Sequence, residues 1–360
     1  MTKLTHTSTH GFFKPLISAI VFGLSINCTN VVANESAQSD HVFNNQKVVR
    51  AIADKLAQDY VFPEKGGQLS KQLLQYVEES KLNNVAQGDE FARMLTEKLQ
   101  ELSHDKHLLI EYNEQPMQSE DPQATADKEA FELKMWRAHN FGFEKVERLP
   151  FNIGYFKLSA FGPTEHVGKL LASTMTLLNN SDALIVDLRG NFGGEEQTVQ
   201  LLLSYFFEEP THTLTMITPK ENKTVQHWTS TYVDGPRYDE NKKVIILVDN
   251  NTVSAAEDFS YAMKHFKRAI LVGEQTGGAA NSGDFVAITD HFSMFLPIAR
   301  GVSPVTQTNW EKTGVIPDVK SSSDEALNKA QMEYLNNLLA KETSERRKQR
   351  ITARLSSLKG

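Results

Sequence analysis

Two short runs of almost uninterrupted apolar residues constrain the fold of this chain most strongly. Residues 183–188 read Ala-Leu-Ile-Val-Asp-Leu, and residues 244–249 read Val-Ile-Ile-Leu-Val-Asp. Such runs are typical of β-strands that are buried on both faces, as in parallel sheets covered by helices. Each run leads through polar or glycine-rich residues into a helix-like segment. The chain is therefore expected to contain an α/β core.

Further segments extend this core over residues 148–323. Residues 152–158 and 269–273 are also predicted to form strands, and strands that alternate with helices favour the α/β class. Residues 324–360 are polar and rich in charge. They are expected to form a solvated, partly frayed C-terminal helix.

Residues 37–113 show the periodicity of helices instead. Their apolar side chains recur at helical spacing in three groups, which predicts a small subdomain of three amphipathic helices. The groups are Val48, Val49, Ile52, Leu56 and Tyr60; Leu69, Leu73, Leu74 and Val77; and Phe91, Met94, Leu95, Leu99 and Leu102. Residues 114–147 are interpreted as a linker, because 114–130 are polar, acid-rich and interrupted by two prolines.

The first 33 residues have the composition of a secretory signal. Lys3 and Lys14 are their only charged side chains, an apolar run at 15–24 follows, and small residues lead to Ala33. The run is too short to span a bilayer comfortably, so we interpret residues 1–33 as a signal peptide that exports the chain to the periplasm or beyond. A buried or membrane-anchoring N-terminal helix is the alternative.

Cysteine and charge set further limits. Cys28 is the only cysteine and lies within this leader, so the mature chain would have no disulfide and no thiol chemistry. Lipid attachment at Cys28 is an alternative, but Asn27 stands where that signal needs a small residue. The net charge of −7 gives no indication of nucleic acid or an anionic membrane as the main partner.

A candidate nucleophile follows the second apolar run. Ser254 lies where the strand should pass into a helix, and Glu257 follows it at the spacing of a capping box. A helix N-cap is therefore the ordinary explanation. A serine at such a turn can also be exposed at the carboxyl edge of a sheet, where ligands bind and helix N–H groups stabilise negative charge. From these residues alone, both interpretations stay open.

The first apolar run leads into a glycine-rich turn over residues 187–194, Asp-Leu-Arg-Gly-Asn-Phe-Gly-Gly. Closely spaced glycines let backbone N–H groups approach a substrate oxygen, as an oxyanion hole requires. The turn lacks the ending of a phosphate loop and the spacing of a dinucleotide site, so no nucleotide cofactor is expected. Asp187 and Arg189 are predicted to form an ion pair that orients the loop.

Together with residues 314–318, these segments resemble the tail-specific (carboxyl-terminal-processing) serine protease family. That family includes the tricorn protease and the interphotoreceptor retinoid-binding protein, and residues 141–155 and 308–311 are most similar to the latter branch. The matching blocks occur in order over roughly residues 45–320. The resemblance implies a crotonase-like core of the ClpP/crotonase superfamily with a small N-terminal helical subdomain. In that core, Ser254 would attack the scissile carbonyl.

The resemblance also bears on the general base. Members with a Ser/Lys dyad carry the lysine in a Thr-x-Gly-Lys-Gly turn, where this chain has Ala279. Tricorn-like members use a histidine oriented by a glutamate. His107, directly before an expected strand, and Glu311 match those two roles, with His104 as the second choice of base. Such a base is what a serine hydroxyl needs before it can attack.

For the oxyanion hole, the resemblance implies the backbone N–H of Ala255 together with that of Gly193 or Gly194. No metal is expected, because the loop histidines and Asp105 fall short of the ligands that zinc needs. The ordinary alternatives are that the histidines face solvent at a helix end and that Glu311 forms a surface ion pair.

Two functions follow from these residues. The first is a serine peptidase that hydrolyses polypeptide substrates, such as unstructured or C-terminal segments of envelope proteins, with loose envelope association and no cofactor. The second is a non-catalytic binding protein for apolar ligands or peptides on the same fold. The presence of a serine, a histidine and a glutamate in their expected blocks favours the peptidase.

The signal-peptide interpretation predicts that the exported protein begins near Asn34. The charge-poor apolar leader that ends at Ala33 is the basis for this expectation. Intact-mass analysis of the exported protein measures its first residue. A retained leader, or an acyl group on Cys28, would contradict the prediction.

Overall fold

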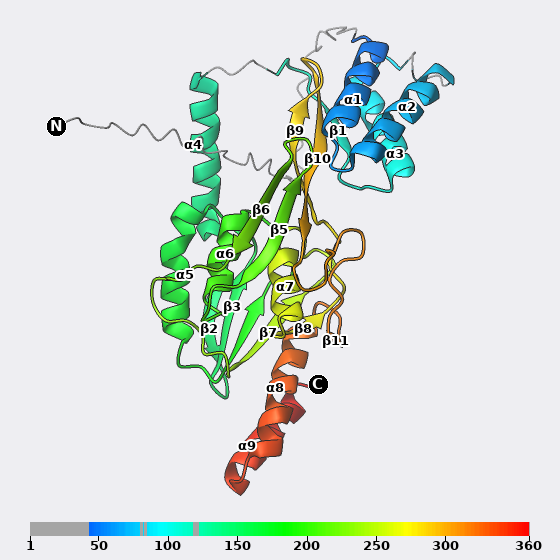
Figure 1. The fold of residues 1–360 in the computed structure, drawn as a ribbon. Helices are drawn as coiled ribbons and strands as arrows, with labels where there is room; N and C mark the ends of the chain where they lie inside the picture. The colour runs from blue at the N-terminus through cyan, green and yellow to red at the C-terminus, as the bar shows by residue number, and fades with distance from the viewer. Residues whose placement is uncertain (1–42, 80–81, 83–84, 118–121, 360) are drawn as a thin grey trace, which may run out of the picture.

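A six-stranded sheet with the strand order β11-β8-β7-β4-β3-β2 forms the centre of the protein (Figure 1). This computed structural model describes residues 43–79, 82, 85–117 and 122–359, so the predicted signal peptide and Cys28 lie outside it. All neighbouring strands are parallel except β2, which pairs antiparallel with β3. The strands are β2 (Phe143–Leu149), β3 (Ile153–Leu158), β4 (Ala183–Asp187), β7 (Lys243–Val248), β8 (Ile270–Gly273) and β11 (Val319–Lys320).

Both faces of this sheet are covered, which explains the continuous apolar runs. In β4, Leu184 and Val186 face the core formed with α5 (Thr164–Leu178), α6 (Glu196–Ser204) and α7 (Ala255–His265). Ile185 faces the opposite side and packs with α8 (Ala326–Lys341). Since successive side chains of a strand point to opposite faces, the interior positions of such a strand are all apolar. The prediction of an α/β core with strands at these four segments is confirmed.

The C-terminal segment differs from the prediction. Ala326 and Ala330 of α8 are fully buried against the sheet, and α9 (Glu345–Ser357) packs onto α8 through Leu335 and Ile351. The segment is helical, as predicted, but it forms two helices, and the expectation that it is solvated and frayed is wrong. Ala326 and Ala330 let the helix approach the sheet closely, and Leu327 and Tyr334 pack beside them.

The N-terminal residues form the three predicted helices, α1 (Asn45–Asp59), α2 (Pro63–Glu79) and α3 (Gly88–Ser103), and this prediction is confirmed. A second, antiparallel sheet joins them to the rest of the chain, in the order β1-β10-β5-β6 with β9 paired to β10. Its strands are β1 (Leu109–Tyr112), β5 (His212–Thr218), β6 (Lys223–Trp228), β9 (Asn281–Ala287) and β10 (Phe292–Val302).

This second sheet brings two distant parts of the sequence together. β1 follows the helices directly and pairs with β10, with Leu109 opposite Phe295. The helices bury Phe91 and Leu95 against Phe292 and Met294 of β10. The helical part and the α/β part therefore share hydrogen bonds and a core cluster. The sequence analysis predicted the short strand after His107, but neither its partner nor the second sheet.

The predicted linker also contains regular structure. Helix α4 (Pro122–Ala138) and the short helix η2 (Asn140–Gly142) occupy much of 114–147, and β2 begins within it. The interpretation as a loop is wrong there. Pro122 takes the first helical position, where proline is favoured, and strong helix formers such as Glu, Ala, Leu and Lys follow. Figure 1 shows α4 standing apart from α1–α3. Among the residues that the structure describes, no helix has the length and apolarity to cross a membrane.

A pair of adjacent glycines in α2 provides a test of how α1 and α2 pack. A Cβ on Gly66 would lie 2.2 Å from the carbonyl oxygen of Leu56, whereas a Cβ on Gly67 would have nothing within 4 Å. Gly66→Ala should therefore lower the free energy of unfolding by about 1–3 kcal/mol through overpacking. Gly67→Ala should raise it by up to about 1 kcal/mol, because alanine favours the helix. Denaturant unfolding measures both, and equal effects would contradict this packing.

Candidate active site

Ser254 lies on a strained turn between β7 and α7. Its backbone has φ 57° and ψ −122°, a conformation that residues other than glycine rarely adopt. α7 begins at the next residue, Ala255, so the turn stands at the carboxyl end of a buried parallel strand. Strain of this kind costs on the order of 1–3 kcal/mol and is found mainly where function requires it. A serine on a sharp strand-to-helix turn is the geometry of a nucleophile elbow.

The glycine-rich turn lies directly against Ser254. A Cβ on Gly193 would be 2.7 Å from the Cβ of Ser254 and 3.2 Å from the nitrogen of Ala255, so only glycine allows this approach. The Gly193 N–H donates to Oδ1 of Asn191 at 2.9 Å, which argues against Gly193 as an oxyanion donor. Within the described chain, the N–H groups of Gly194 and Ala255 have no hydrogen-bond partner. Two backbone donors are thus available at this turn.

Asn191 fixes the position of that turn. It is fully buried, its side-chain amide donates to the carbonyl of Leu158 at 2.7 Å, and its own carbonyl accepts from the N–H of Val253 at 2.9 Å. The loop after β4 is thereby tied both to the end of β3 and to the residue before Ser254. The predicted ion pair of Asp187 with Arg189 is also present, at 2.5 Å, and is confirmed.

Glu257 holds the nucleophile turn to a second turn. Its carboxylate is fully buried and accepts four hydrogen bonds. Oε1 accepts from Oγ1 of Thr276 at 2.5 Å and from the N–H of Gly278 at 2.7 Å. Oε2 accepts from the N–H groups of Ser254 at 2.9 Å and Ala279 at 2.8 Å. Burial raises the pKa of Glu257 and the hydrogen bonds oppose that shift. Three backbone N–H groups and a hydroxyl around two oxygens favour the ionised form.

His107 comes from the N-terminal part of the chain, just before β1. Its Nδ1 lies 2.9 Å from Oδ1 of Asp105, and its backbone N–H donates to the same oxygen at 3.0 Å. Asp105 is almost completely buried, and its Oδ2 accepts from the hydroxyl of Tyr60 at 2.6 Å. These contacts fix the ring and place the proton on Nδ1, which leaves Nε2 as the basic nitrogen. The ring of Phe295 on β10 stacks beside it, with 6.2 Å between the ring centres.

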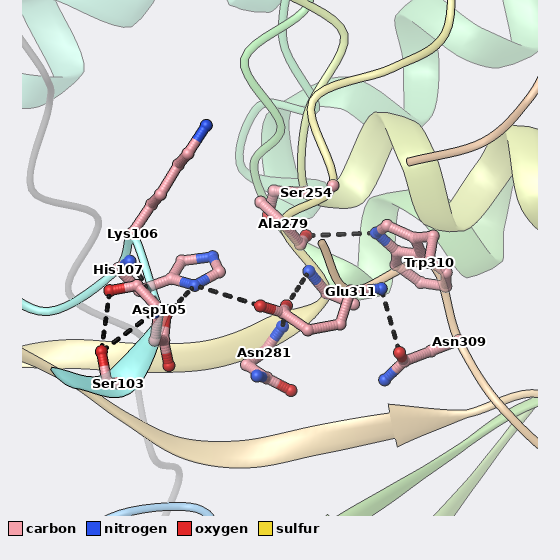
Figure 2. Close-up of polar contacts among 12 residues, drawn as sticks. Ser103, Asp105, Lys106, His107, Ser254, Ala279, Asn281, Asn309, Trp310 and Glu311 are labelled. Atoms are coloured by element: carbon pink, nitrogen blue, oxygen red, sulfur yellow. Dashed lines mark hydrogen bonds and ion pairs between the residues drawn. The ribbon is translucent and has the colours of Figure 1, made fainter. Parts of the chain in front are cut away.

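Glu311 approaches His107 from the α/β part. Its Oε1 lies 3.7 Å from Nδ1 of His107, too far for a hydrogen bond. Its Oε2 accepts from the N–H groups of Ala280 at 2.9 Å and Asn281 at 3.2 Å. The turn that Glu257 holds from one side is therefore held by Glu311 from the other. Figure 2 shows the His107 ring directed toward the Glu311 carboxylate, and Ala279 drawn beside Ser254.

The surrounding charges favour the protonated imidazole. Burial by itself lowers the pKa of His107, but the hydrogen bond and charge of Asp105, followed by the charges of Glu311 and Glu257, raise it above its ordinary value. For Asp105, burial raises the pKa, and the hydrogen bonds from His107 and Tyr60 lower it to below the ordinary value. The pair is therefore built to carry an ionised carboxylate beside an imidazole that readily accepts a proton.

The structure separates the two histidines. His104 is exposed at the left-handed end of α3 (φ 52°), whereas His107 lies among the acidic side chains.

One ligand atom each of Asp105, His107 and Glu311 lies within 4.8 Å of the others, a spacing at which a metal could bind. Each group is already engaged by hydrogen bonds inside the protein, however, and three such ligands alone fall short of a structural zinc site. The hydrogen bonds by themselves account for the placement of these side chains.

The contacts link Ser254 to His107 through Glu257, the turn at 276–281 and Glu311. In the described chain no hydrogen bond joins Ser254 directly to His107. Such bonds are often long in free enzymes and shorten when substrate binds. The sequence analysis named Ser254, His107, Glu311 and the glycines.

Three further residues were not recognised for their role in the site. Asp105 was considered only as a metal ligand, Glu257 only as half of a capping box, and Asn191 not at all. The Asp-x-His spacing was the one available signal for Asp105.

Two family profiles match the sequence of this chain. Residues 152–321 match the sequence profile of peptidase family S41, and residues 43–140 match that of the N-terminal domain of S41 peptidases in eukaryotic IRBP. The chain belongs to peptidase family S41. The candidate site draws on both matches, because His107 lies in the N-terminal match and Ser254 and Glu311 in the other.

Individual S41 relatives are distant. The chain is 24% identical over 184 residues to the chloroplastic carboxyl-terminal-processing peptidase 1 of Arabidopsis thaliana. The aligned region covers 51% of this chain and 36% of the relative. It thus spans about a third of the length of that curated relative. The solved photosystem II D1 C-terminal processing protease has a TM-score of 0.51 and 14% identity, covering 79% of this chain and 94% of that one.

A putative peptidase from Parabacteroides merdae has a TM-score of 0.53 and 18% identity, covering 78% of this chain and 89% of that one. At these identities the two solved structures show the fold alone. They agree with a mixed α/β S41 fold that carries an N-terminal helical region.

Proposed function

We propose that this S41 chain is a serine peptidase that hydrolyses peptide bonds through an acyl-enzyme on Ser254. The observation that carries the proposal is the strained Ser254 turn, because its unusual backbone brings the serine, Gly193 and the free N–H of Ala255 together. A helix cap alone does not require a positive φ at the capping residue, since N-caps ordinarily adopt extended backbone. The strain supports a catalytic use of this serine.

In the proposed reaction, Oγ of Ser254 attacks the substrate carbonyl carbon while Nε2 of His107 takes the hydroxyl proton. The N–H groups of Ala255 and Gly194 would stabilise the oxyanion of the tetrahedral intermediate. His107 then gives its proton to the leaving amine, and the C–N bond breaks. Water, activated by the same imidazole, hydrolyses the acyl-enzyme and restores Ser254.

Two carboxylates have different roles in this proposal. Asp105 accepts the hydrogen bond of Nδ1 at 2.9 Å, so we assign to it the orientation of His107. Glu311, at 3.7 Å, would stabilise the imidazolium by its charge and shape the turn at 280–281 by its two backbone hydrogen bonds. Ala279 stands where dyad relatives carry lysine, so this chain has no lysine base at that position. The backbone N–H of Ala279 donates a hydrogen bond to Glu257. Histidine is therefore the proposed base.

We also propose the location and substrates of the enzyme. The leader at 1–33 supports export to the periplasm or secretion, with unstructured or C-terminal segments of envelope proteins as substrates and a loose association with the envelope. We assign the core, residues 148–323, to the crotonase-like class and residues 37–113 to the helical subdomain. The order of parallel strands and covering helices supports this assignment.

Ser254→Asn separates catalysis from helix capping. Asparagine caps a helix about as well as serine and tolerates positive φ, but its amide cannot form an acyl-enzyme. The variant should therefore melt near the wild type, while cleavage of unfolded polypeptide falls by about 10⁴-fold or more. Thermal melting, peptidase assays and labelling by a fluorophosphonate probe measure these properties.

Ser254→Ala is the matched control, because it removes both functions and should lower the free energy of unfolding by about 0.5–2 kcal/mol. Cleavage that survives in Ser254→Asn would place the nucleophile elsewhere. A wild type that neither labels nor cleaves would favour the binding protein instead.

Asp105→Asn tests the orientation of the base. Loss of the anion destabilises the imidazolium, so the pKa of His107 should fall and the acid limb of the pH–rate profile should move to lower pH. The maximal rate should drop by about 10²-fold or more, because asparagine can stabilise the wrong tautomer. Glu311→Gln is the comparison and should move the limb less, since its carboxylate is farther from Nδ1. An acid limb that does not move in Asp105→Asn would exclude the assigned role.

A further inference from the structure

An unpaired carboxylate lies one helical turn after the candidate nucleophile. Asp258 of α7 is only 6% exposed, and no hydrogen bond or ion pair to its carboxylate exists among the residues that the structure describes. Burial, with the nearby charge of Glu196, raises the pKa of Asp258 to about 8. A buried acidic group without a donor is unfavourable, and such groups in native proteins are nearly always paired.

Among the described residues, Glu196 is the one whose charge acts on Asp258, and it has the same sign. Glu196 opens α6 and adds a second carboxylate, whose Oε2 lies 3.8 Å from Nε2 of His227 on β6. Burial lowers the pKa of His227, which keeps that imidazole neutral, and its Nδ1 is buried without a partner. The side chain of Glu196 is 36% exposed, so the cluster is open to solvent on that side. Asp258, Glu196 and His227 are called the acidic cluster below.

The acidic cluster is next to the proposed reaction centre. Asp258 is in the first turn of α7, which begins directly after Ser254. Glu196 follows the Gly193–Gly194 turn by two residues, and that turn contacts both Ser254 and Ala255. Glu196 and Asp258 therefore lie in the first turns of the two helices that begin beside the Ser254 turn.

We propose that Asp258 and Glu196 form a specificity subsite for a cationic side chain, lysine or arginine, of the substrate residue whose carbonyl Ser254 attacks. An ammonium or guanidinium group would supply both the positive charge and the donors that the acidic cluster lacks. This assignment rests on the proposed function for its placement beside the scissile bond. It names a substrate class that neither the family nor the catalytic residues specify.

Peptide binding to Ser254→Ala tests the subsite without turnover. The probes are two labelled peptides that are identical except for lysine or norleucine at one central position. Fluorescence anisotropy measures the dissociation constant of each peptide. The measurement is made at a pH above the Asp258 pKa of about 8. The lysine peptide should bind at least about tenfold more tightly, as expected for a desolvated charge pair. Adding Asp258→Asn should remove that difference. Adding Glu240→Gln, an exposed carboxylate at the other end of β7, should preserve it.

The subsite would be overturned if the two peptides bind equally or if neither binds. It would also be overturned if the preference for lysine survives in Asp258→Asn. Mass spectrometry of an unfolded protein digested by the wild type tests the proposed function separately. Cleavage should concentrate after lysine and arginine, and Asp258→Asn should lose that preference. Selective binding without any cleavage would refute the peptidase and retain the subsite. Cleavage that ignores lysine and arginine would refute the subsite and retain the peptidase.

Discussion

The buried carboxylate of Glu257 is the interaction on which the rest of the candidate site depends. Four donors from two turns converge on it, from Ser254 on one side and from Thr276, Gly278 and Ala279 on the other. An ionised group without water requires such a complete set of partners, and removing any of them leaves a charge that is costly to bury. The position of the serine and that of the following turn are therefore fixed together. The strain at Ser254 is sustained because this network determines the backbone on both sides of it.

The candidate catalytic groups come from two parts of the S41 fold. Ser254 and Glu311 belong to the α/β part, whereas His107 stands at the end of the helical part, immediately before β1. Pairing of β1 with β10 and the common core around Phe292 hold the parts together. The hydrogen bond from Tyr60 to Asp105 continues that attachment to the imidazole itself. Proper docking of the helices is thus a condition for a correctly placed base.

Neighbouring acidic residues on α7 illustrate how hydrogen bonding decides the use of a buried charge. Glu257 has a full set of donors and serves as a structural anchor. Asp258, the next residue, has none within the described chain, and its pKa is raised to about 8. A satisfied carboxylate stabilises the native turn, while an unsatisfied one is poised to gain a partner from outside. Two residues of the same charge on one helix therefore have opposite consequences for the protein.

The sequence by itself determined the α/β core, the three N-terminal helices and the segments that carry Ser254, His107 and Glu311. These features are local: apolar runs, helical periodicity and short motifs appear in a few consecutive residues. It did not reveal the second sheet, α4 as a helix, the packing of α8, or the roles of Asp105, Glu257 and Asp258. Those depend on which donors and which apolar faces meet across long stretches of chain. Only the tertiary structure decides that, because burial and hydrogen-bond partnership are properties of the assembled environment and not of the residue type.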